Sequence, residues 1–143
     1  MASNSLPEIR TGYGKPAVTK PPDELLTFVR GECDLLKFSH REHVRMGFEM
    51  LRRHSFPETV LHYSQALRKM TARGGRPDAY HETITIAFLS LVAERMGETN
   101  DFEEFASLNP DLLDKSILAR WYSPERLASD CARRMFVLPG PRG

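Results

Sequence analysis

Residues 84–93, which read Ile84-Thr-Ile-Ala-Phe-Leu-Ser-Leu-Val-Ala93, decide the fold class of this chain. When these residues are placed at the about 100° steps of an α-helix, apolar side chains cover nearly the whole circumference. Only the sector of Thr83, Ser90 and Glu94 is polar. A helix that is apolar nearly all round is usually buried at the centre of its domain. The sequence therefore predicts a central helix over about residues 78–96.

The rest of the chain carries helix signals as well, and nothing in it shows the period-two alternation of a strand. Ser39 and Glu42 form the S-x-x-E pattern of a capping box, which predicts a helix that begins at His40. Helices are expected over residues 23–33, 40–54, 57–73, 78–96, 101–109 and 124–135, with short turns over 111–122. Short connections favour antiparallel neighbours. We therefore expect an all-α fold, an irregular antiparallel bundle of about five to seven helices in a single domain.

Composition and charge exclude several classes of protein. The 20 Lys and Arg residues balance 19 Asp and Glu residues, so the charge gives no reason to expect nucleic-acid or membrane binding. Two cysteines, Cys33 and Cys131, are too few for a disulfide framework. No apolar run approaches the roughly 20 residues that cross a bilayer. The first residues lack the apolar segment of a secretory signal. We expect a cytoplasmic protein whose partner is a small molecule, and a homodimer is compatible with the sequence.

The two ends of the chain differ from its middle in composition. Residues 1–22 are rich in Pro and Gly and contain few large apolar groups, which predicts a flexible N-terminal arm. Residues 137–143, Val-Leu-Pro-Gly-Pro-Arg-Gly, predict a flexible C-terminal tail for the same reason. The helical domain is expected to span residues 23–136.

Four polar residues stand where a helical domain is normally apolar. His40 falls at the centre of the apolar stripe of its expected helix, and His43 lies one turn away on the same side. On the expected central helix, His81 points among apolar residues, and Glu82 lies in an apolar sector off its centre. A buried carboxylate without a partner is costly or takes up a proton, so a cation is expected beside Glu82.

A metal site is one hypothesis for these residues. Two histidines three residues apart on a helix can converge on one ion, and a histidine and a carboxylate from a facing helix can complete the ligand set. The expected ligands are His40, His43, His81 and Glu82, and the expected cofactor is a divalent Zn, Fe or Mn ion. The sequence contains neither the repeated Glu-x-x-His pairs of di-iron bundles nor an H-E-x-x-H motif.

A metal-free pocket is the second hypothesis. In it His40 or His81 acts as a general acid or base, and Glu82 sets the tautomer and the pKa of the imidazole. The third possibility is structural: the histidines are hydrogen-bonded parts of a non-catalytic helical interaction protein. The sequence leaves all three open, and with them the question whether the protein is an enzyme.

Further residues would contribute to a ligand pocket. Tyr80 and Thr85, which lie within a turn of His81, could orient a small ligand. Arg133, from the last expected helix, could neutralise Glu82 or bind an anion.

Several short motifs occur together in this chain. They are an F-x-H-x-x-H-x-R segment with Phe38, His40, His43 and Arg45, then Tyr80-His-Glu-Thr83, Tyr122-Ser-Pro, and Ala132, Arg133 and Phe136. In these motifs the chain resembles, over about residues 25–139, a family of small bacterial proteins whose activity is uncharacterised. The resemblance implies no cofactor and no catalytic residue, but it adds Tyr122 and Ser123 to the candidate site beside Arg133.

Overall fold

The computed structural model describes residues 22–141, and these residues contain helices and turns but no strand, which confirms the all-α prediction. The predicted N-terminal arm lies outside the described residues, except for residue 22. The α-helices are α1 (Asp23–Val29), α2 (His40–Arg53), α3 (Phe56–Arg73), α4 (Glu82–Arg95), α5 (Phe102–Leu108), α6 (Pro124–Ala128) and α7 (Asp130–Arg134). Short 3₁₀ helices lie at Leu35–Lys37, Pro77–Ala79, Pro110–Leu113 and Lys115–Arg120.

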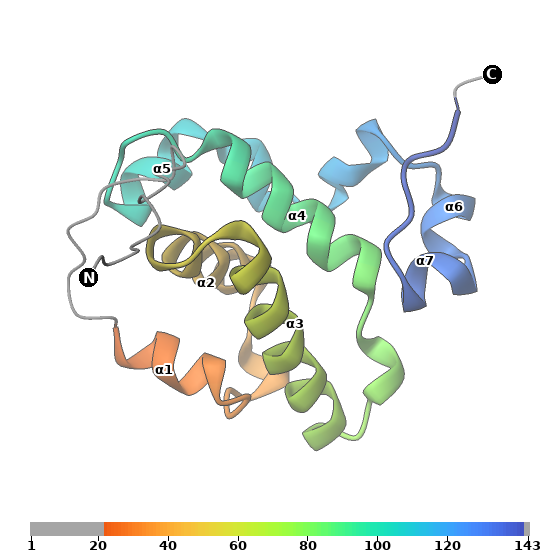
Figure 1. Cartoon of the computed structure of the whole chain (residues 1–143), viewed down its shortest axis with the longest axis horizontal. Coiled ribbons are helices and arrows are strands. Elements are labelled where there is room, and N and C mark those ends of the chain that lie inside the picture. Colours follow the sequence, from red (N-terminus) through yellow and green to blue (C-terminus); the bar gives the residue numbers. More distant parts are fainter. Residues whose placement is uncertain (1–21, 142–143) are drawn as a thin grey trace, which may run out of the picture.

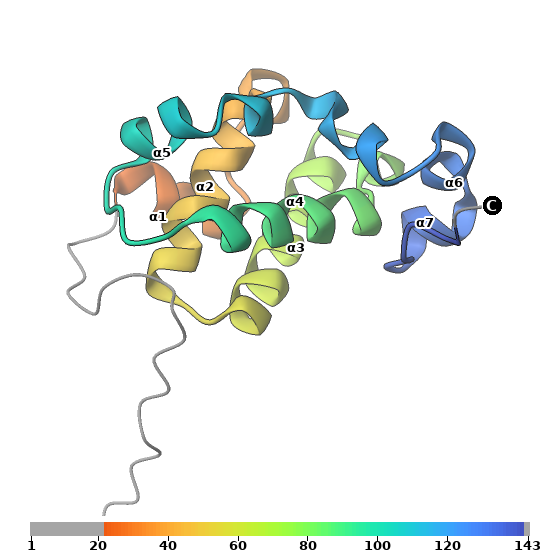
Figure 2. The ribbon, with the colours of Figure 1, turned by 90° about the horizontal axis from the view of Figure 1, so that it is seen from above.

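Helices α2, α3 and α4 form the centre of the molecule (Figure 1). Helix α2 packs against both α3 and α4, and α1 packs on α2 and α3. Helix α5 and the two 3₁₀ helices that follow it run along one side of α2 and α4 (Figure 2). Helices α6 and α7 lie at one end of the molecule, where α7 packs against α4.

Two clusters of buried apolar side chains hold these helices together, and α2 and α4 contribute to both. The larger cluster joins α2 and α4 to α5, the 3₁₀ helices and Tyr122, with Phe48 and Phe105 fully buried. The smaller cluster joins α1, α2 and α3 and includes Leu89 of α4. Helix α4 therefore lies between two cores, as expected for a helix that is apolar nearly all round.

Helix α4 begins later than the sequence predicts. Residues Pro77–Ala79 form a separate 3₁₀ helix, and Tyr80 and His81 are extended, with ψ angles of 138° and 111°. The His81 ring caps the helix by accepting a hydrogen bond from the Ile84 backbone N–H. The helical phase predicted for His81 is therefore wrong, because this residue precedes the helix. Glu82 is its first helical residue.

Two other helices differ from their predicted spans, one by ending early and one by being divided. Helix α1 ends at Val29 rather than near residue 33, because Gly31 adopts a φ of 73°, which favours glycine. A Cβ at Gly31 would also lie 2.5 Å from the Cβ of Lys69 on α3. The last predicted helix is divided at Ser129, whose extended backbone ends α6 and whose hydroxyl accepts from the Ala132 N–H to begin α7.

The segment after α7 is tied to the start of α4. The Thr83 hydroxyl donates to the Met135 carbonyl at 2.9 Å and accepts from the Val137 N–H at 3.1 Å. The Tyr122 hydroxyl donates to the Val137 carbonyl at 2.7 Å. Thr83, predicted to be on the polar sector of its helix, is fully buried by these contacts. Residues 137–143 were predicted to form a flexible tail, but these hydrogen bonds anchor Val137, the first residue of that tail.

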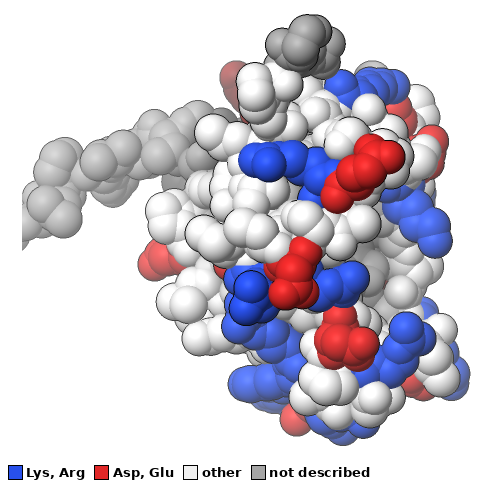
Figure 3. All heavy atoms as spheres, turned by 90° about the vertical axis from the view of Figure 1, so that its right-hand side faces the viewer, with Lys and Arg blue, Asp and Glu red and all other residues white. Residues whose placement is uncertain are grey.

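The surface that carries α6 and α7 has charges of both signs. Lys and Arg side chains alternate with Asp and Glu side chains across this face (Figure 3). No helix within residues 22–141 is both long and apolar enough to cross a membrane.

Candidate functional site

A cavity of about 460 Å³ lies between α2, α3 and α4. Its apolar wall comes from Leu35, Phe38, Val44, Gly47, Leu67, Ala79, Ile84, Phe88, Leu89 and Val92. Its polar side chains are His40, His43, Tyr63, Thr71, Tyr80, His81, Thr85 and Lys115. All three histidines that the sequence singled out thus line one cavity, together with Tyr80 and Thr85. Glu82, Tyr122 and Arg133 do not line it.

His40 is the first residue of α2, which the Ser39 hydroxyl caps by accepting from the Glu42 N–H. The His40 Nε2 lies 2.9 Å from the carbonyl oxygen of Leu112, and its ring packs edge-on against Phe88 at 4.8 Å. A carbonyl oxygen can only accept, so the neutral ring carries its proton on Nε2. The Nδ1 atom therefore keeps a free lone pair, with no hydrogen-bond donor to it within residues 22–141.

His43 lies one turn further along α2. The Tyr63 hydroxyl donates its single proton to the His43 backbone carbonyl at 2.8 Å, so the contact of 3.4 Å between His43 Nδ1 and the hydroxyl oxygen requires a proton on Nδ1. The other nitrogen, Nε2, then keeps its lone pair. Burial, together with the nearby His40, lowers the pKa of His43 to about 4, so the ring is neutral at pH 7.

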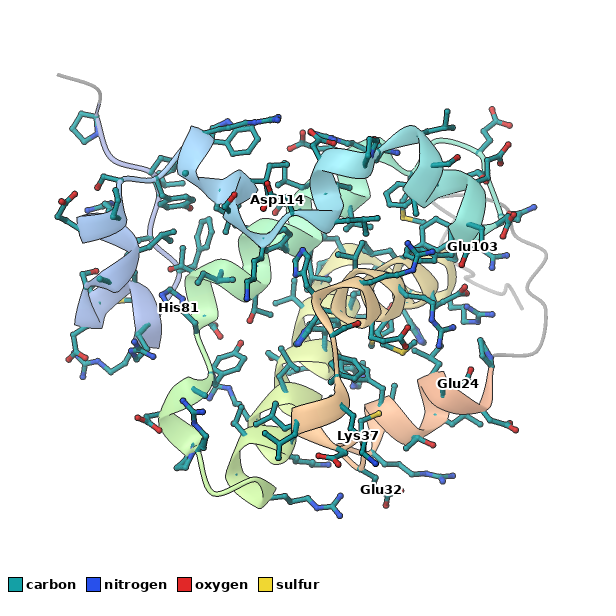
Figure 4. All side chains as sticks on the ribbon, turned by 180° about the vertical axis from the view of Figure 1, so that it is seen from behind. Glu24, Glu32, Lys37, His81, Glu103 and Asp114 are labelled. Atoms are coloured by element: carbon teal, nitrogen blue, oxygen red, sulfur yellow. The ribbon has the colours of Figure 1, made fainter. Side chains whose placement is uncertain are left out.

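His81 lies between the first turn of α4 and the C-terminal helices (Figure 4). Its Nδ1 accepts from the Ile84 N–H at 3.2 Å, and its Nε2 donates to the Leu127 carbonyl of α6 at 2.7 Å. Both ring nitrogens are therefore engaged by the backbone. Although it lines the cavity, His81 in this conformation has no nitrogen left for a metal ion or for proton transfer.

Glu82 does not line the cavity that the histidines share. Its carboxylate accepts from the Tyr80 hydroxyl at 2.5 Å and pairs with Arg68 of α3 at 3.2 Å. The Arg68 guanidinium also lies over the Tyr80 ring, 4.7 Å from its centre. Burial and the adjacent carboxylate raise the pKa of Tyr80 to about 12. The expected role of Glu82 in orienting a histidine is not realised in this geometry, because Tyr80 and Arg68 occupy its carboxylate.

Arg133 is not the charge partner of Glu82. It donates instead to the Asp78 carbonyl at 2.7 Å, which ties α7 to the 3₁₀ helix before α4. Tyr122 is a buried core residue that holds the C-terminal segment, and Thr85 donates to the His81 carbonyl at 2.8 Å. A cation does lie beside Glu82, as predicted, but it is Arg68 of α3.

Three polar residues of the cavity were not among the predicted site residues. Tyr63 lies on the buried stripe of α3, where its spacing from Thr59 and Leu67 is a helical signal that could have been used. Thr71 continues the same stripe. Lys115 begins a 3₁₀ helix, and no pattern in the sequence marks it as a cavity residue.

The described part of the chain brings no three His, Cys, Asp or Glu side chains into a group that could hold a metal ion. The predicted ligand set of His40, His43, His81 and Glu82 is divided between three environments. The lone pairs of His40 and His43 are free, the His81 nitrogens are bonded to the backbone, and Glu82 pairs with Arg68. The metal hypothesis thus has no support from the arrangement of the ligands.

Comparison with known proteins adds no relative. No protein-family model matches the chain, and neither a curated protein nor a solved structure is similar to it.

Proposed function

We propose that this protein binds a small, mainly apolar organic molecule in the cavity between α2, α3 and α4. The observation that carries this proposal is the cavity itself. Its volume of about 460 Å³ lies within the range of roughly 300–1,000 Å³ that is usual for small-molecule sites. Its wall combines many apolar side chains with a few polar ones, which is the usual composition of such sites.

Binding is favoured over acid–base catalysis by the state of the histidines. A general base works best when its pKa is close to the working pH, whereas the pKa of His43 is lowered to about 4. His81 has no free nitrogen, and Glu82 touches neither imidazole. His43, His81 and Glu82 are therefore better suited to hold a ligand or the fold than to move protons, which leaves His40 as the one predicted acid–base residue with an unpaired ring nitrogen on the cavity wall.

A cavity-filling substitution tests this proposal. Ile84 and Ile86 are both half-buried on α4, but only Ile84 lines the cavity. The probe is 2-naphthol, a small aromatic alcohol. We expect Ile84→Trp to weaken its binding by more than tenfold, because the indole takes up the space of the ligand. We expect the matched control Ile86→Trp to change it less than threefold.

Binding is measured by titrating 2-naphthol into each protein and recording the amide NMR shifts, which also show which residues respond. Shifts confined to the cavity residues would support the proposal. Shifts elsewhere, or equal binding by the two variants, would contradict it.

A further inference from the structure

We propose that the ligand carries a hydroxyl or N–H group that donates a hydrogen bond to the free imidazole nitrogen of His40 or of His43. The ligand would then be a neutral, mainly apolar alcohol, phenol or N–H heterocycle. This inference rests on the proposed binding function and specifies the chemistry of its ligand.

The buried and half-buried donor side chains of the cavity already donate to other groups of the protein. The Tyr63 and Tyr80 hydroxyls donate to a His43 carbonyl and to Glu82. The Thr71 and Thr85 hydroxyls donate to backbone carbonyls one turn before them, at 3.1 and 2.8 Å. The proton-bearing nitrogens of the histidines are engaged as well. A ligand that needs donors from the protein therefore finds none of these available.

Acceptors are available in the same cavity. His40 keeps a lone pair on Nδ1, because Nε2 bonds to Leu112, and His43 keeps one on Nε2, because Nδ1 faces Tyr63. Both residues are only half-buried, so water can reach these nitrogens in the free protein. A purely apolar ligand displaces that water and leaves the acceptors unpaired, which costs free energy, whereas a ligand O–H or N–H that reaches either nitrogen replaces it.

The charges of the lining residues favour a neutral ligand. No carboxylate lines the cavity, so a cationic ligand would have no counter-charge inside it. The only cation among the lining residues is Lys115, which is exposed and solvated. An anionic headgroup inside the cavity would face two imidazole lone pairs instead of donors. A neutral donor group needs no counter-charge, and it can pair with an imidazole lone pair.

Three naphthalene derivatives of similar size separate these possibilities. 2-Naphthol offers a donor, 2-methoxynaphthalene lacks it, and 2-naphthoate is an anion. We expect 2-naphthol to bind the wild-type protein at pH 7 roughly fivefold to tenfold more tightly than the ether, the usual effect of one hydrogen bond. We expect 2-naphthoate to bind most weakly.

The outcomes distinguish this inference from the proposed function. Equal binding of 2-naphthol and the ether, or tighter binding of 2-naphthoate, would overturn the inference while the binding function stands. If none of the three probes binds, the proposed function itself fails.

A variant locates the acceptor. His43→Phe keeps an aromatic ring but removes the nitrogen, so we expect the preference for 2-naphthol over the ether to fall at least threefold. His62→Phe, at an exposed position of α3, is the matched control and should keep the wild-type preference. An unchanged preference in His43→Phe and in the corresponding His40→Phe variant would overturn the inference.

Nitrogen-15 NMR of the histidines provides a readout that does not depend on folding of the variants. In the wild-type protein we expect His43 to show a protonated Nδ1 and an unprotonated Nε2. Addition of 2-naphthol should shift a lone-pair nitrogen of His40 or His43, and the ether should not. A shift of the same size with both probes would contradict the proposed hydrogen bond.

Discussion

The start of α2 and the start of α4 use the same residue type in opposite ways. At α2, Ser39 caps the helix, so His40 and His43 lie within the helix and each keeps one unpaired nitrogen. At α4, His81 is itself the cap, and the backbone takes both of its nitrogens. Since the Nε2 atoms of His40 and His81 each bond a distant carbonyl, the position inside a helix or just before it decides only whether Nδ1 stays available for a ligand.

The largest effect should come from the histidine that is fully bonded. We expect His81→Ala to lower the free energy of unfolding by about 2–3 kcal/mol, because it removes a helix cap and leaves the Leu127 carbonyl without its donor. Urea unfolding followed by circular dichroism measures this change. The control His62→Ala, at an exposed site, should stay within about 0.5 kcal/mol of the wild type. A loss in His81→Ala no larger than in this control would break the comparison.

A second prediction concerns the pH dependence that His43 contributes. Its pKa is lowered from 6.5 to about 4 in the folded protein. As the pH falls, His43 is therefore protonated in the unfolded chain at a higher pH than in the folded protein. The stability contribution is therefore unaffected above about pH 6.5, decreases between pH 6.5 and 4, and levels off below pH 4. The total loss is of the order of 3 kcal/mol, since each pKa unit corresponds to about 1.4 kcal/mol.

The measurement compares unfolding curves of the wild type and His43→Phe between pH 7 and 4. Both proteins share the other titrating groups, so the difference between them isolates His43. We expect the gap in stability to shift in favour of the Phe variant as the pH falls. A gap that stays constant over this range would show that His43 is not held neutral, and it would remove the distinction between the two helix starts.

The smallest effect is expected from metal ions. Purified without a His-tag or chelator and then incubated with Zn²⁺, Fe²⁺ or Mn²⁺, the protein should hold less than one equivalent and show little change in Tm. The reason is that His81 and Glu82 are already bonded within the protein. One bound equivalent that disappears in both His43→Ala and His81→Ala would restore the metal hypothesis and show that His81 exchanges its backbone bonds for an ion.

Much of the fold could be read from local signals. The capping pattern at Ser39 marked the start of α2 to the residue, and the apolar run of residues 84–93 indicated a helix between two cores. The start of α4 was placed too early because Pro77 and Asp78 are good helix-starting residues, and they do start a helix, but only the short 3₁₀ helix Pro77–Ala79. Whether residues 77–81 join α4 or form a separate 3₁₀ helix depends on tertiary packing, and the periodicity of the sequence gives no information about that packing.

For the candidate site, the helical phase of α2 correctly brought His40 and His43 to one cavity, because both lie within a regular helix. The charge partner of Glu82 could not be found this way. Arg68 and Arg133 are the same residue type, and only the crossing of α3 with the start of α4 brings Arg68 within 3.2 Å of the carboxylate. Tyr63 lies on the buried stripe of α3, and its helical spacing does not show that its hydroxyl reaches His43 of α2.

Periodicity and capping act within a few residues along the chain, so they predict the helical class, the central position of the 84–93 segment and the inward direction of the α2 histidines. The cap bond from the Ile84 N–H to the His81 Nδ1 is equally local, whereas the bonds of the Nε2 atoms of His40 and His81 depend on tertiary structure. Their partners, Leu112 for His40 and Leu127 for His81, lie 72 and 46 residues away. A hydrogen bond across such a separation exists only after the helices have packed, so its presence cannot be read from local sequence.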